Sequence, residues 1–124
     1  MNTNDDRYGR PAAVVQAEHG GVAWRSVVHA QLSANVDHGD WYSITAEMVD
    51  TLRSLASLAT VFAQQIAHYG ESKALRDDAG MDPAERLAAA SARAAELRIE
   101  LDRTERVANA FWSEISHIAV EEWS

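Results

Sequence analysis

The chain has 124 residues, enough for one domain with a hydrophobic core but too few for two. Its 11 Lys and Arg against 19 Asp and Glu leave a formal net charge of -8, which argues against nucleic-acid binding through phosphates. The absence of Cys excludes disulfides, thiolate metal sites and a cysteine nucleophile. Only 2 Pro and 6 Gly interrupt the sequence, which favours long helices.

The N-terminal part is expected to hold a tail and helical segments. Residues 1–10 are polar and without periodicity, so we expect a flexible tail followed by a single helical domain over 11–124. No basic segment precedes an apolar one, so a secretory signal is not indicated and a cytoplasmic protein is expected. A short helix over 11–18 should end at Gly20 and Gly21, and Trp24, Val28 and Leu32 predict a helix over about 22–35.

A long helix is predicted over about 44–69, after a turn at 35–40. Its apolar residues are spaced 4, 3, 4, 3, 4, 3, which predicts a heptad seam at Met48, Leu52, Leu55, Ala59, Phe62, Ile66 and Tyr69. After Arg53 no formally charged residue occurs over the sixteen positions 54–69, and Leu58 and Val61 lie off the seam. Ser, Thr and Gln within this stretch argue against a membrane span. We therefore predict a helix that is buried on two faces.

The last helix is predicted over about 83–122. Asp82 and Pro83 have the residue types preferred at an N-cap and at the first helical position. A second heptad seam is predicted at Leu87, Ala90, Ala94, Leu97, Leu101, Thr104, Ala108, Phe111, Ile115 and Ile118.

These elements predict an all-α fold, a long antiparallel helical hairpin of 44–69 and 83–122 with the helix of 22–35 packed on it. The first long helix should run out near Ala108, so that the aromatic end of the last helix extends beyond it. The second face of the uncharged helix predicts a homodimer with a four-helix core. The predicted partner-binding residues are Leu58, Val61, Phe111, Trp112, Ile115 and Trp123.

One constellation could carry metal chemistry. Glu114 and His117 form the Glu-x-x-His half-motif of di-iron bundles, and a site would need a further carboxylate such as Glu47. Both residues of the motif lie about 110° from the centre of the predicted seam, which indicates a solvated face. No nucleophile elbow or phosphate-binding loop occurs, so neither catalysis nor a cofactor is expected.

The resulting hypothesis is a non-enzymatic regulator or adaptor that binds a protein partner through apolar helical surface, without nucleic acid or membrane. Two alternatives stay open. One is a bundle that binds a metal or small ligand at Glu114 and His117, and the other is an acidic inhibitor of a nucleic-acid-binding protein.

Overall fold

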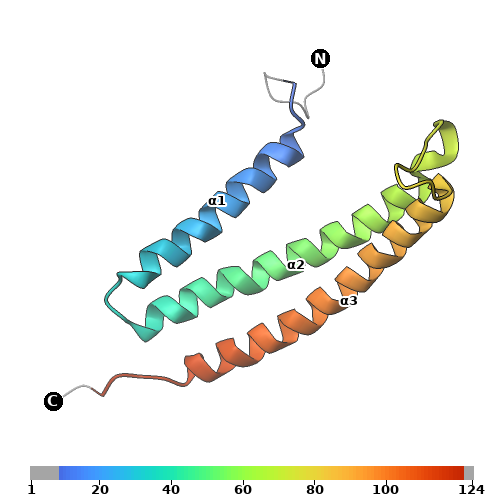
Figure 1. The fold of residues 1–124 in the computed structure, drawn as a ribbon. Coiled ribbons are helices and arrows are strands. Elements are labelled where there is room, and N and C mark those ends of the chain that lie inside the picture. The colour runs from blue at the N-terminus through green and yellow to red at the C-terminus, as the bar shows by residue number, and fades with distance from the viewer. Residues whose placement is uncertain (1–8, 122–124) are drawn as a thin grey trace. The chain divides into compact units, whose positions relative to one another are not determined.

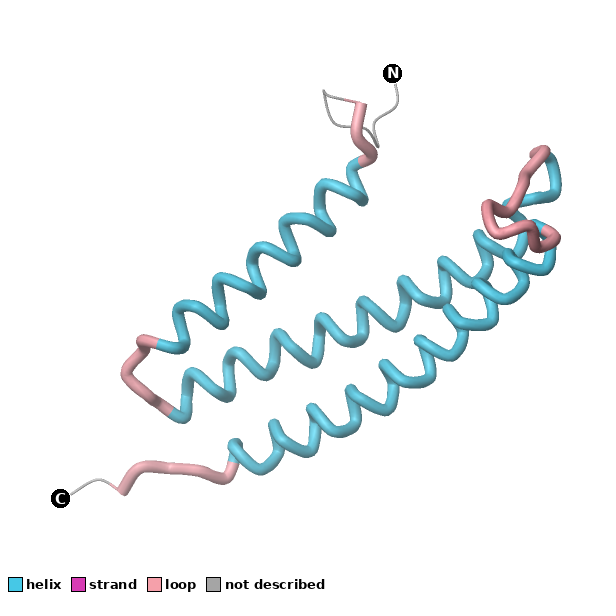
Figure 2. Tube along the Cα trace, in the orientation of Figure 1, coloured by secondary structure: helices cyan, strands magenta, loops and turns pink. Residues whose placement is uncertain are grey.

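The computed structural model describes residues 9–121, without the side chain of Ser72. This part of the chain is all-helical, with helices α1 (Ala12–Leu32), α2 (His38–His68) and α3 (Pro83–Ser116) and a short 3-10 helix η1 (Tyr69–Ser72) (Figure 2). It falls into two compact units, Met1–Val36 and Asp37–Ser124. The predicted tail lies largely outside the described residues, and the packing of the N-terminal helix on the hairpin stays a prediction.

Helix α1 is a single helix, so the prediction that it breaks at Gly20 and Gly21 is wrong. Neither glycine has the positive φ of a helix C-cap. Because good helix formers flank the pair, the helix continues through it despite an expected cost of about 0.5–1 kcal/mol per glycine relative to Ala. The helix has no buried residue, and Trp24 and Val27 are its half-buried apolar side chains in the middle.

Helices α2 and α3 form an antiparallel hairpin, which confirms the predicted pairing (Figure 1). Three contacts fix their register: the Ser91 hydroxyl donates to the Ala63 carbonyl at 2.8 Å, Arg98 donates to the Thr60 hydroxyl, and Arg53 pairs with Glu105 at 3.3 Å. The paired residue numbers rise in α3 as they fall in α2. The two helices therefore run past each other along nearly their whole lengths.

The boundaries of both helices differ from the predicted ones. Helix α2 begins at His38 instead of near residue 44, because the carbonyl of Asp37 already accepts from the amides of Asp40 (3.1 Å) and Trp41 (3.4 Å). Helix α3 ends at Ser116 instead of near residue 122. There the Ser116 hydroxyl donates to the carbonyl of Ser113 at 2.6 Å, the kind of local bond with which serine competes against helix continuation.

The start of α3 follows the predicted capping chemistry. The Asp82 side chain accepts from the amide of Ala84 at 3.0 Å, and Pro83 occupies the first helical position. This confirms that Asp82 and Pro83 mark the helix start.

The seam between α2 and α3 agrees with the predicted one at every second position and is shifted by one residue at the positions between them. The side chains that α2 directs toward α3 are buried or half-buried and follow a 4, 3, 4, 3, 4, 3 spacing, at Thr45, Val49, Leu52, Ala56, Ala59, Ala63 and Ile66. In α3 the corresponding positions are Leu87, Ser91, Ala94, Arg98, Leu101, Glu105, Ala108, Trp112 and Ile115. In α2 the smaller Val49, Ala56 and Ala63 take the places predicted for Met48, Leu55 and Phe62. Because helix separation depends on the side chains at the contact, these residues allow a close approach.

Candidate functional site: an apolar face on the hairpin

One flank of the hairpin is polar. Thr60, Arg53 and Ser57 lie on the same side of α2, and Arg98 and Glu105 lie on the corresponding side of α3. The Arg98–Thr60 and Arg53–Glu105 contacts join the two helices along this side. Because these contacts place the polar sides of both helices together, the opposite sides of both helices must share the other flank.

The other flank carries most of the large exposed apolar side chains, together with the charged Arg93 and Glu100 of α3. The side chains of α2 on this flank are spaced 4, 3, 4, 3, 4 along the helix, beside the seam. Side chains of α3 that lie next to them in the hairpin register extend the same surface. We define the apolar face as Ile44, Met48, Leu55, Leu58 and Phe62 of α2 with Leu97, Val107 and Phe111 of α3. Exposed fractions run from 40% for Met48 to 66% for Val107, and only Ile44 falls into the half-buried class. On α2 the seam buries Val49, Ala56 and Ala59, while Met48, Leu55 and Phe62 beside them are left on this face.

Two threonines interrupt the apolar face at one level. Thr51 and Thr104 occupy heptad positions within it, and their numbers place them opposite each other in the hairpin register. The Thr104 hydroxyl donates to the Glu100 carbonyl of its own helix at 2.9 Å. With this hydroxyl satisfied, Thr104 interrupts the face with little polar character.

The structure places three of the predicted partner-binding residues on accessible surface. Leu58 is 43% exposed, Val61 44% and Phe111 50%. Leu58 and Phe111 belong to the apolar face, whereas Val61 points away from the seam by the 100° per residue of a helix. Trp123 lies outside the described residues.

Trp112 and Ile115 are part of the hairpin interior, and the predicted uncovered end of α3 does not occur for them. Ile115 is 8% exposed, and Trp112 is half-buried with its ring centroid 5.2 Å from that of Tyr42. The reason is the earlier start of α2, whose added first turns cover this end of α3. The Trp112 indole N–H is buried and has no hydrogen-bond partner among the described residues.

The residues of the metal alternative do not converge. Glu47, Glu114 and His117 are all exposed, and no group of three His, Asp or Glu side chains that could hold a metal ion occurs within residues 9–121. His117 serves instead as the residue that ends α3, its amide donating to the Glu114 carbonyl at 3.2 Å.

The closed end of the hairpin is organised by Asp77. Its carboxylate accepts from Arg86 Nε at 2.7 Å and from the amides of Ala79 (3.0 Å) and Met81 (3.1 Å). The Arg86 guanidinium is the main reason that the pKa of Asp77 is lowered to about 2, and the amides add to it. Gly80 closes the same turn with φ +82°, a backbone conformation that favours glycine.

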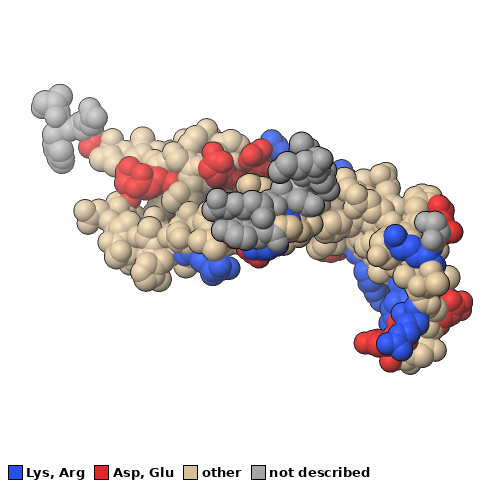
Figure 3. Space-filling model, turned by 90° about the horizontal axis from the view of Figure 1, so that it is seen from above, with Lys and Arg blue, Asp and Glu red and all other residues tan. Residues whose placement is uncertain are grey.

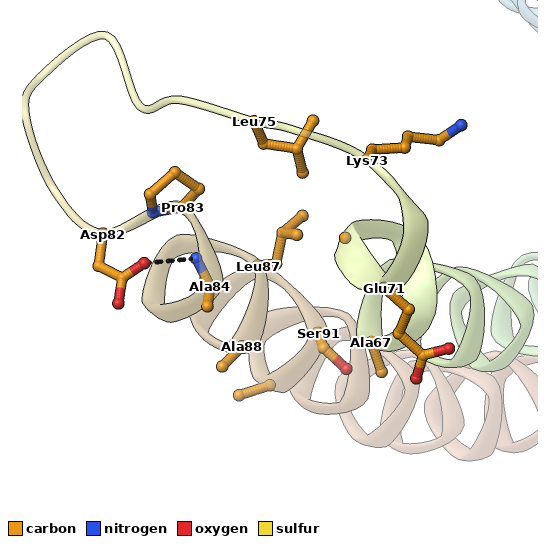
Figure 4. A pocket seen from close by; sticks show the side chains of 12 residues that line it. Ala67, Glu71, Lys73, Leu75, Asp82, Pro83, Ala84, Leu87, Ala88 and Ser91 are labelled. Carbon is orange, nitrogen blue, oxygen red and sulfur yellow. Dashed lines mark hydrogen bonds between the residues drawn. The ribbon is translucent and has the colours of Figure 1, made fainter.

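Charged side chains of both signs gather at this closed end (Figure 3). A shallow groove of about 750 Å³ lies there between η1 and the start of α3, with Leu75, Leu87 and Ala88 among its lining and Glu71 and Lys73 at its rim (Figure 4). The Lys73 ammonium lies 5.1 Å from the centre of the Tyr69 ring.

Comparison with known proteins returns no match among family models, curated proteins or solved structures. Within the described chain, no helix has the combination of length and apolarity that crossing a bilayer needs. Function must therefore be argued from the geometry.

Proposed function

We propose that this chain is a non-enzymatic interaction protein, a small regulator or adaptor that binds a protein partner through the apolar face of its hairpin. The observation that supports the proposal is the row of half-exposed large apolar side chains along α2 and α3, of which Leu55 (43%), Phe62 (45%) and Leu97 (51%) are typical. Contiguous exposed apolar surface of this kind usually marks an interface.

The energetics favour covering this face. Fully burying a Leu, Met or Phe side chain stabilises by about 1.5–3 kcal/mol, so completing the burial of a half-exposed one contributes about 1 kcal/mol. The contribution recurs along the face at 3- and 4-residue intervals, which is the spacing that another helix can match. The face is therefore suited to a helical partner.

Self-association into a homodimer with a four-helix core is part of this proposal. A two-layer arrangement of hairpins is a common way in which such faces are buried, and a homodimer needs only the surface that each copy already carries. The helix α1 can pack on the same bundle, as its Trp24 and Val27 favour.

Site-specific photo-crosslinking in the cells that make this protein tests the proposal. A photoreactive phenylalanine analogue is placed at Leu58 on the apolar face, and a matched chain carries it at Asp50, which is exposed and off that face. We expect a defined adduct from position 58 and none from position 50. An adduct at twice the 13.6 kDa of the chain identifies a second copy, and another mass identifies a foreign partner. Equal or absent adducts at both positions contradict the proposal.

A further inference from the structure

The first two turns of α2 lie over the end of α3 and are weakly held as a helix. We define this segment, His38–Ile44, as the lid. It contains no buried residue, since His38, Gly39 and Ile44 are half-buried and the other four residues are exposed. All seven residue types, His, Gly, Asp, Trp, Tyr, Ser and Ile, rank below Ala, Leu and Glu as helix formers. The N-cap residue, Asp37, makes no capping hydrogen bond with its side chain. The helical state of the lid therefore depends on its contact with α3.

The contact between the lid and α3 leaves one polar atom unsatisfied. The ring of Tyr42 in the lid meets the ring of Trp112 in α3, with 5.2 Å between the centroids. The indole N–H of Trp112 is buried and has no hydrogen-bond partner among the described residues. A buried donor without an acceptor disfavours the closed arrangement, because the same group is hydrogen-bonded when water reaches it. Moving the lid away from α3 restores that hydrogen bond.

The lid covers two large side chains of α3. Ile115 lies ten residues beyond Glu105 in α3, and the lid lies about ten residues before Arg53, the partner of Glu105, in α2. Ile115 is 8% exposed under the lid, and Trp112 is half-buried. Both neighbour Phe111, which is 50% exposed and belongs to the apolar face. Opening of the lid therefore extends the apolar face to the end of α3.

We infer that the lid is a conformational gate, which unwinds from α3 in the native hairpin and thereby adds Trp112 and Ile115 to the apolar face. The rest of the hairpin stays paired in the open state through buried seam residues such as Val49, Ala56 and Ala59. A partner that covers the two released side chains shifts the population toward the open state. The inference rests on the proposed function, because it names the regulation of the same face.

Hydrogen exchange of the full chain, measured by NMR, tests this inference. The lid amides, those of residues 42–45, bond to carbonyls of the lid, so one opening releases them together with the indole proton of Trp112. We expect both to be protected at least about tenfold less than the seam amides, those of residues 52–66, and to depend weakly on urea. If the indole proton and the lid amides exchange only together with the seam amides, the inference is overturned.

Gly39→Ala assigns the exchange to the lid. Because Ala favours the helical state over Gly, exchange of the lid amides and of the Trp112 indole should slow by about 2- to 5-fold, with the seam amides unchanged. A Cβ at Gly39 meets only the Asp37 carboxylate within 4 Å, and this side chain is 59% exposed and can move. Gly20→Ala in α1 is the matched control and should leave all three sets of protons unchanged. Equal effects of the two variants on the Trp112 indole also overturn the inference.

The exchange measurement and the crosslink at Leu58 fail independently. A lid that stays closed while Leu58 forms a defined adduct overturns the gate and leaves the proposed function standing. A lid that opens while no adduct forms contradicts the proposed function and leaves the opening itself established.

Discussion

Asp77 shows how much one residue determines at the closed end of the hairpin. Its side chain is 6% exposed and joins the connecting segment to Arg86 of α3 as well as to two backbone amides. Without this carboxylate, the amides of Ala79 and Met81 would have to donate to water instead. The carboxylate thereby ties the connection to the first turn of the last helix.

We predict that Asp77→Asn lowers the melting temperature at neutral pH, because the charged acceptor of Arg86 is lost. Since the pKa of Asp77 falls from 3.8 to about 2 on folding, its contribution is present above about pH 4 and is lost as pH falls toward about 2. Thermal melts from pH 7 to pH 2 should show the two chains converging at the acid end. Asp78→Asn, at an exposed neighbour, serves as the control, and an equal effect of both would contradict this role.

The helices illustrate which part of the packing could be predicted from sequence. Leu52, Ala59 and Ile66 lie in the seam of α2 as predicted, because a heptad spacing fixes every seventh residue on one face. The alternate positions moved by one residue, from Leu55 to Ala56 for example, since a pattern weighted by hydrophobicity undervalues alanine. Close approach through small side chains is a property of the helix pair, and neither helix shows it alone.

The same shift explains the outcome for the candidate site. Leu58 was predicted to be accessible because it lies off the predicted seam. Phe111 was predicted within the seam of the last helix and is accessible for another reason, since the seam of α3 passes through Trp112 instead. Trp112 and Ile115 were misplaced because the start of α2 at His38 was hidden in a segment that reads as a turn. A signal for the apolar face existed in the second 4, 3 spacing through Ile44, Met48 and Thr51.

Enlarging a seam alanine should separate the helices. Ala59 is 2% exposed, and we predict that Ala59→Leu destabilises the chain by about 1–3 kcal/mol, the usual result of overpacking. Ala95→Leu, at an exposed position of α3, should change stability by less than about 0.5 kcal/mol. Chemical denaturation of the two variants measures the difference, and a neutral Ala59→Leu would argue against the small-residue seam.

Helix α1 offers a gain in stability. A Cβ at Gly20 meets nothing within 4 Å, so Gly20→Ala should stabilise the helix by about 0.5–1 kcal/mol through backbone entropy alone. The expected result is higher helical signal and slower amide exchange over residues 12–32. Unchanged amide exchange over these residues would contradict the prediction that the glycine limits the stability of α1.

At the scale of the whole molecule, the hairpin is a layer with two unlike flanks. Contacts such as Arg98–Thr60 give one flank its polar character, and the larger apolar side chains are collected on the other. A net charge of -8 favours the solubility of a chain that exposes such a face. We propose that function follows from surface complementarity at the apolar face, and a second copy is the occupant that the mass measurement tests.

The most direct test is the solution mass of the purified chain, measured by light scattering after size exclusion at several loading concentrations. We predict a mass near twice 13.6 kDa that falls toward the monomer only on strong dilution. A mass of 13.6 kDa at every concentration, with intact helical signal, would contradict the pairing of two hairpins through the apolar face.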